Sequence, residues 1–164
     1  MPAASVLVGC NTSGCSDNHS ALPLLGFYRS TTHASLTLDS LAIGGVGAPG
    51  DSLLVHPGEN VTQLYLPFRQ DASVTSFYIR YAYASQGLDR PELNDTVTFH
   101  YSASPYFASE ECGAMYQYRV HRVDYTRHLI DSVAVTDSMV TNIERERFQI
   151  YIRVAETPEE GEEQ

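Results

Sequence analysis

A hydrolase triad needs a histidine, a carboxylate and a nucleophile, and His128, Asp131 and Ser132 supply these types within five positions. Side chains of a strand alternate between its two faces, so a strand here would put His128 and Ser132 on one face and Asp131 on the other. Asp131 could not then orient the histidine, as a triad requires. The chain has no Gly-x-Ser-x-Gly, His-Glu-x-x-His or phosphate-binding glycine motif. We therefore predict no catalytic residues and a non-enzymatic protein; a triad assembled from distant residues is the alternative.

The first cysteine ends a short apolar run, MPAASVLVGC, over residues 1–10. Leu7-Val8-Gly9-Cys10 resembles the lipobox of bacterial lipoprotein signals, in which the cysteine is diacylated and becomes the mature N-terminus. No Lys or Arg precedes the run, so residues 1–10 are interpreted as a truncated signal. The resemblance implies lipidation of Cys10 and attachment to a membrane, because each buried methylene of an acyl chain contributes about 0.8 kcal/mol.

Two cysteines then remain, Cys15 and Cys112. Cysteines pair in oxidising compartments, so an exported protein would form a Cys15–Cys112 disulfide. In the chain-entropy view, a loop of this length stabilises the fold by up to about 4.7 kcal/mol. The alternatives are two free thiols, or a metal site that adds His19 to both cysteines. The spacing fits no compact zinc module, so we predict no metal and no cofactor.

A short pattern recurs five times: Asp, then Ser or Thr, then an aliphatic or other apolar residue. Asp-Ser and Asp-Thr pairs close turns through hydrogen bonds from side chain to backbone, which gives one explanation. The pattern also resembles the acceptor motif of general O-glycosylation in exported proteins of Bacteroidales and their relatives. That resemblance implies sugars on Ser40, Ser52, Thr96, Ser132 and Ser138. The match at Asp95-Thr96 follows an acidic turn. A calcium site formed by Asp89, Glu92 and Asp95 is a weaker interpretation of that turn.

The charge of the chain limits its partners. Ten basic residues, all arginine, stand against twenty acidic ones, for a net charge of −10. Few cations are offered to a phosphate backbone or to anionic lipid, so we expect no nucleic acid partner and no polybasic membrane contact. The closing segment, residues 155–164, is acidic and has no apolar face, which predicts a disordered tail.

Aromatic and β-branched residues in short alternating runs predict strands joined by turns. We expect an all-β domain at residues 24–154, an antiparallel, immunoglobulin-like β-sandwich of eight or nine strands, with a closed barrel as the alternative. Residues 11–23 are polar and predict a tether. Three local expectations follow: a central strand through Phe77 and Ile79, a mobile loop at residues 44–50, and a strand that ends at Pro105.

Several motifs together resemble an uncharacterised family of putative Bacteroidales lipoproteins. They are Gly26-Phe27-Tyr28, Leu66-Pro67-Phe68, Ser104-Pro-Tyr-Phe107, Glu110-Glu-Cys-Gly113 and Thr126-Arg-His-Leu-Ile-Asp131-Ser132. The resemblance implies a lipoprotein of the bacterial cell envelope, at the outer rather than the inner membrane. We hypothesise a module that binds an envelope protein, or else a glycan. The outward residues Tyr78, Arg80, Arg119 and Tyr151 are candidates for its contact face.

Overall fold

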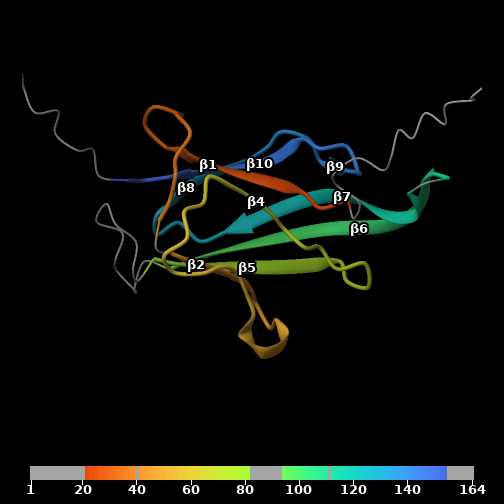
Figure 1. Ribbon diagram of the computed structural model, residues 1–164. Helices are drawn as coiled ribbons and strands as arrows, with labels where there is room; N and C mark the ends of the chain where they lie inside the picture. Colours follow the sequence, from red (N-terminus) through yellow and green to blue (C-terminus); the bar gives the residue numbers. More distant parts are fainter. Residues whose placement is uncertain (1–20, 40, 82–93, 111, 155–164) are drawn as a thin grey trace, which may run out of the picture.

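The computed structural model describes residues 21–39, 41–81, 94–110 and 112–154, and these form two packed β-sheets. One sheet has four strands in the order β4-β1-β10-β8, and the other has six in the order β3-β2-β5-β6-β7-β9 (Figure 1). The strands are β1 Leu24–Arg29, β2 Ala42–Gly45, β3 Leu53–Val55, β4 Gln63–Tyr65, β5 Val74–Arg80, β6 Asp95–Ser109, β7 Gly113–Tyr125, β8 Ile130–Val135, β9 Met139–Val140 and β10 Glu146–Ile152. A single 3-10 turn, η1 Pro49–Asp51, is the only helical element among the described residues.

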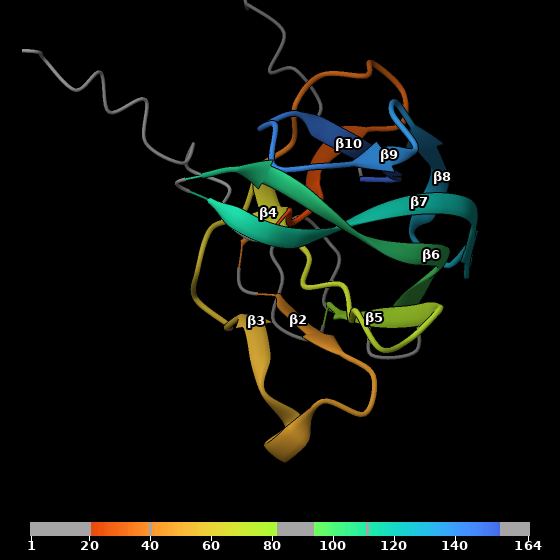
Figure 2. The same cartoon turned by 90° about the vertical axis from the view of Figure 1, so that its right-hand side faces the viewer.

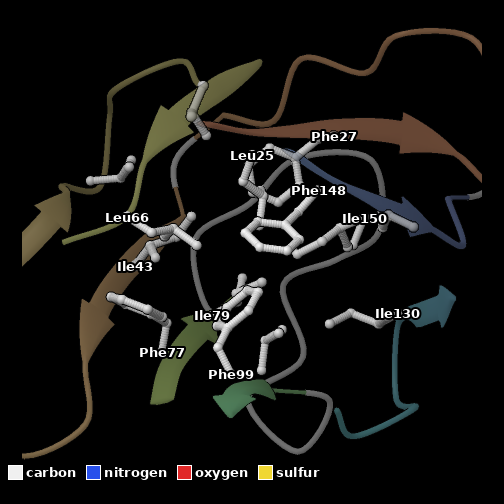
Figure 3. Packing of buried hydrophobic residues seen from close by; sticks show 14 of the residues in the cluster. Leu25, Phe27, Ile43, Leu66, Phe77, Ile79, Phe99, Ile130, Phe148 and Ile150 are labelled. Carbon is white, nitrogen blue, oxygen red and sulfur yellow. The ribbon is translucent and has the colours of Figure 1, made fainter. Parts of the chain in front are cut away.

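The core lies between the sheets and is built by alternating side chains. Leu25 and Phe27 of β1 face Phe77 and Ile79 of β5, and all are at most 4% exposed (Figure 3). Aromatic rings bridge the layers: the rings of Phe99 and Phe148 lie 4.7 Å apart. Burial of one face of each strand is the main force that holds two sheets together.

The predicted all-β sandwich is confirmed, with ten strands in the described residues where the sequence suggested eight or nine. The pairing is antiparallel except between β1 and β10, the first and last strands, which run parallel. The central strand is also confirmed, since β5 pairs with β2 on one side and β6 on the other. Leu38 and Leu41 are both buried although they have opposite parity along the chain, so the alternation changes sides between them.

Two local predictions are wrong. Gly44 and Gly45 belong to β2, so the loop is shorter than residues 44–50. β6 continues through Pro105, which pairs with Tyr116 of β7. Pairing with β5 extends along β6 only as far as His100, so Pro105 lies where β6 is an edge strand and has no need of a backbone N–H on that side.

The β6–β7 hairpin projects beyond the rest of the sandwich (Figure 1). Phe107, near its tip, is 67% exposed. β1 and β10 both begin at the end of the sandwich from which this hairpin projects. None of the described residues form a helix long and apolar enough to cross a membrane.

Candidate functional site

One hollow among the described residues lies beside the connection between β2 and β3. It has a volume of about 510 Å³. Its lining residues come from three segments: residues 45–49 with Ser52 and Leu54, then Pro67 and Arg69, then residues 75–77. We call it the loop hollow. Small-molecule and side-chain pockets have volumes of about 300–1,000 Å³, so its size suits a ligand.

The β2–β3 connection forms one wall and stands away from the sheet (Figure 2). Its shape depends on left-handed backbone: φ is +72° at Gly47 and +65° at Gly50, where glycine has no steric cost. The Val46 N–H donates to the Ser76 carbonyl at 2.8 Å and fixes the start of the connection to β5. Beyond that bond, Val46 and Leu54 remain 59% and 38% exposed.

The opposite wall is held rigidly by the core. Phe68 is buried and stacks on Tyr101 with ring centres 4.5 Å apart. The Tyr101 hydroxyl donates to the Arg69 carbonyl at 2.9 Å and accepts the Arg69 N–H at 3.0 Å. Thr75 shares a third hydrogen bond with the same hydroxyl at 2.7 Å. Pro67 and Arg69 are therefore fixed relative to β5.

The chemistry of the loop hollow favours binding. Its lining side chains are mostly apolar, and none is a histidine, cysteine or carboxylate. The one charge at its rim is Arg69, whose Nε lies 3.4 Å from an Asp71 oxygen, with both side chains well exposed. The hydroxyls of Thr75 and Ser76 are occupied by Tyr101 and Thr98. An apolar group can be bound here, and an arginine is placed to orient a polar end.

Among the described residues, Asp95 at the start of β6 is the carboxylate with the most hydrogen-bond donors, and its side chain is 0% exposed. It accepts backbone N–H groups of His128, Leu129 and Ile130 at 2.8 to 3.0 Å. The Thr126 hydroxyl donates to it at 2.5 Å, and the Tyr81 hydroxyl at 3.3 Å. Burial, and then the neighbouring Asp95 carboxylate, raise the pKa of Tyr81 well above its ordinary value. We call these groups the Asp95 network.

The residues of the suspected triad are not bonded to one another. His128 Nδ1 lies 2.7 Å from the Asn94 carbonyl oxygen, and Asp131 accepts from Arg153 at 2.9 and 3.1 Å. Ser132 lies within β8. A second histidine–carboxylate pair, His100 Nε2 with Asp124 at 2.8 Å, is on the exposed face of β6 and β7 beside Arg122. No nucleophile contacts either histidine among the described residues.

No group of three or more histidine, cysteine, aspartate or glutamate side chains in the described residues is arranged to hold a metal ion. Of the suspected calcium ligands, Asp95 has its oxygens occupied by N–H and O–H donors. Asp89 and Glu92 lie outside the described residues.

Cys112 lies in the turn between β6 and β7, where its backbone N–H donates to the Ser109 hydroxyl at 3.0 Å. Cys10 and Cys15 lie outside the described residues, as do the signal, most of the tether and the acidic tail. Lipidation and the disulfide therefore stay predictions.

The suspected glycosylation residues differ in accessibility. Ser52 is exposed at the loop hollow, whereas Thr96, Ser132 and Ser138 are half-buried in or beside strands. Ser40 lies outside the described residues. The turn-closing role of the repeated Asp is seen at Asp137, which accepts the Met139 N–H at 2.9 Å. Asp95 and Asp131 bind partners more than twenty residues away.

The suspected contact residues do not form one surface. Tyr78, Arg80 and Arg119 belong to strands of the six-stranded sheet, whereas Tyr151 belongs to the four-stranded sheet. The Arg80 guanidinium lies over the Tyr78 ring, 4.3 Å from its centre. The Tyr78 hydroxyl is buried against Gly44 and has no hydrogen-bond partner among the described residues.

Sequence reasoning missed two polar clusters. Buried Arg147 pairs with Asp137 and donates to the Ile143 carbonyl at 3.0 Å. Burial lowers the pKa of Arg147, an effect that Asp137 opposes. The Glu146 carboxylate accepts from Tyr28, Gln63 and Gln149, each at 2.7 Å. Burial, and then Glu146, raise the pKa of Tyr28. No sequence signal marks these clusters, because Asp137 precedes Arg147 by ten residues and Glu146 gathers Tyr28 and Gln63 from two other strands.

The sequence was also compared with known proteins. It matches a family of unknown function, DUF6452, over residues 40–152. That range includes the six-stranded sheet, the loop hollow and the Asp95 network. No curated protein and no solved structure matches the chain.

Proposed function

Because the chain belongs to DUF6452, a family of unknown function, we propose its role from its own geometry: a non-enzymatic binding module of the bacterial cell envelope. The observation that carries this proposal is the loop hollow. It is the place where exposed apolar side chains, Val46 and Leu54, border a concavity with an arginine at its rim. Exposed apolar groups around a concave surface mark binding sites rather than ordinary protein surface.

The ligand we propose is an apolar group presented by an envelope protein. One wall of the loop hollow is glycine-rich backbone and the other is fixed by Tyr101, so a side chain can enter against a rigid floor. Arg69 would meet a carbonyl or carboxylate of the partner, since its present partner, Asp71, is an exposed ion pair of little net strength.

Attachment to the envelope is the second half of the proposal. Cys10 would carry the lipid, and a Cys15–Cys112 disulfide would fasten the tether to the β6–β7 hairpin. Two observations support the disulfide. β1 begins at the same end of the sandwich as the hairpin (Figure 1). The six Cα–Cα steps from Cys15 to Ala21 can span roughly 20 Å when extended, which gives the Cys15 thiol a wide reach around the start of β1.

Site-specific photo-cross-linking in cells tests the binding site. A photoactivatable residue replaces Val46, which is 59% exposed at the loop hollow, or Ile143, which is 62% exposed elsewhere. We expect one reproducible adduct from position 46 and none of the same mass from position 143. Equal labelling at both positions, or none at 46, would contradict the proposal.

Fractionation tests the anchor independently. Cys10→Ser should move the protein from the membrane to the soluble fraction, while Cys112→Ser should leave it in the membrane. Non-reducing and reducing electrophoresis of the Cys112→Ser protein should no longer differ in mobility. Membrane retention of the Cys10→Ser protein would contradict the lipid anchor and would leave the binding proposal unaffected.

Glycan binding is the second candidate, and one cluster favours it. The Tyr151 ring in the four-stranded sheet lies 5.7 Å from Tyr28 and 4.8 Å from His33. Sugar rings stack on such aromatic groups. Against this, the hydroxyls of Tyr28 and Tyr151 already donate to Glu146 and Gln149. A glycan array on which Tyr151→Ala loses a signal that the Val46 variant keeps would favour this candidate over the loop hollow.

A further inference from the structure

The sandwich has several open strand edges, and most carry a feature that discourages pairing with another chain. β3 and β4 have three residues each, and β9 has two. The outer part of β6 contains Pro105, and the stretch of β7 beyond its contact with β9 carries His121, Arg122 and Asp124. Short length, proline and charge are the usual protections of an edge strand.

β8 has no proline and is longer than β3, β4 or β9, and its one charge and its one register shift both lie at Asp131, near its start. Its six residues, Ile130 to Val135, pair with β10 on one side, and β8 is the last strand of its sheet. Figure 2 shows it at the margin of the molecule with no described strand beyond it. Its single charge, Asp131, is already bound by Arg153, and the whole chain has no lysine to protect an edge. Val135, at its end, is 44% exposed.

The hydrogen bonds identify which backbone groups of β8 face outward. The Thr136 N–H donates to the Arg147 carbonyl at 2.9 Å, in register with the β8–β10 pairing. Antiparallel pairs alternate between bonded and non-bonded positions, so Thr136, Ala134 and Ser132 direct their N–H and C=O groups towards β10. Val133 and Val135 therefore direct theirs towards the open side.

We propose that β8 pairs with β8 of a second copy of this chain, antiparallel about a two-fold axis at Ala134. In this register Val133 lies opposite Val135 of the partner subunit, and each such pair exchanges both of its backbone hydrogen bonds. Ala134 lies opposite Ala134 of the partner subunit. The two four-stranded sheets become one continuous sheet.

The side chains of β8 are self-complementary in this register, which favours a second copy over an unrelated strand. Val133 packs against the core and Val135 is exposed, so their pairing covers an apolar side chain that one copy leaves in water. Alanine at the axis lets the strands approach, and isologous contacts of this kind are the commonest in homodimers. Each copy carries a charge of −10, so association strengthens as salt screens the repulsion. This inference does not depend on the proposed function.

Analytical ultracentrifugation of the full chain carrying Cys10→Ser tests the dimer. We expect a concentration-dependent species of twice the 18.1 kDa chain mass, more populated in higher salt. Ala134→Lys places two lysines directly opposite each other at the axis, with Cβ atoms roughly 5 Å apart, and should weaken the dimer at least tenfold. Ser132→Lys adds the same charge to the same face of β8 but lies opposite Thr136 of the partner subunit, and should weaken it much less.

A second variant tests the backbone contact without charge. Val135→Pro removes an outward N–H that β10 does not use, so each copy should still fold by circular dichroism while the dimer is lost. A protein that stays monomeric at every concentration would overturn the proposal. So would equal effects of Ala134→Lys and Ser132→Lys, or a dimer that Val135→Pro leaves intact.

Discussion

The Asp95 network and the loop hollow show opposite ways of using polar and apolar groups. The Asp95 side chain is completely buried, and three backbone N–H groups and two hydroxyls donate to its oxygens. The loop hollow exposes valine and leucine to water and leaves them without a covering element among the described residues. The Asp95 network, which contains a carboxylate and hydroxyls, therefore has a structural role. The loop hollow, whose lining is mostly apolar, is the surface available to a ligand.

The location of Asp95 explains its role. β7 ends at Tyr125 in the six-stranded sheet, and β8 begins at Ile130 in the four-stranded sheet. The chain crosses between the layers over residues 126–129. The Thr126 N–H still donates to the Thr96 carbonyl of β6, and the N–H groups of His128 and Leu129 donate to Asp95 instead of to a strand. Asp95 accepts three N–H groups there and so fastens the crossing to β6. Buried N–H groups must find acceptors, which makes this carboxylate hard to replace.

Removing Asp95 should have the largest effect on stability. Asp95→Ala leaves the N–H groups of Leu129 and Ile130 buried without an acceptor, and each such group costs about 1–3 kcal/mol. We expect the free energy of unfolding to fall by about 4 kcal/mol, measured by urea denaturation. Asp124→Ala removes an exposed carboxylate of the same sheet and should cost less than about 1 kcal/mol. Equal losses would contradict the architectural role of Asp95.

Asp137→Ala should have the next largest effect, because it leaves the Arg147 guanidinium buried without its charged partner. We expect a loss of about 3 kcal/mol in unfolding free energy.

The same pair gives a pH dependence. The hydrogen bond from the Met139 N–H is the main cause that holds the pKa of Asp137 below its ordinary value of 3.8. Burial opposes this lowering, and the charges of Arg147 and Arg145 add to it. A carboxyl whose pKa is lower in the folded state stabilises the fold at pH values above its unfolded pKa. Its contribution is lost as the pH falls below about 4, so unfolding of the wild-type protein in acid should be steeper than that of the Asp137→Ala variant.

Gly26→Ala should have a smaller effect on the free energy of unfolding, and that effect should depend on Glu146. A Cβ at position 26 would overlap the Glu146 carboxylate and come within 2.8 Å of its Cδ. That carboxylate is held by Tyr28, Gln63 and Gln149, so its displacement breaks their hydrogen bonds. We expect a loss of about 2 kcal/mol in the wild-type background and less than half of that in a Glu146→Ala background, by a double-mutant cycle.

Much of the fold is predictable from short-range alternation. Phe77 and Ile79, or Phe148 and Ile150, show the period of a half-buried strand, and all four are buried. The prediction at Pro105 was wrong because a strand tolerates proline where one of its sides is unpaired. Whether β6 is unpaired there depends on where its pairing with β5 ends, and residues near Pro105 in the sequence do not specify that. The parallel pairing of β1 with β10 joins the two ends of the domain, and no local pattern specifies it.

The candidate site was less predictable than the fold. Sequence reasoning treated the glycines of the β2–β3 connection as a mobile loop, whereas the hollow depends on Pro67 and Arg69 from a separate segment. Asp95 was recognised only as part of a turn and as a possible calcium ligand, since four of its five donors lie more than thirty residues further along the chain. Sequence patterns report neighbours along a strand, and these sites are made by neighbours across strands.

The most direct test of the account fills the loop hollow without altering the network. Ala48 lines the hollow in the β2–β3 connection and is not one of the groups bonded to Asp95, so Ala48→Trp should change the unfolding free energy by less than about 0.5 kcal/mol. In cells, the adduct formed by a photoactivatable residue at position 46 should then disappear. An adduct of undiminished yield in the Ala48→Trp protein would contradict the claim that this hollow is where the protein binds its partner.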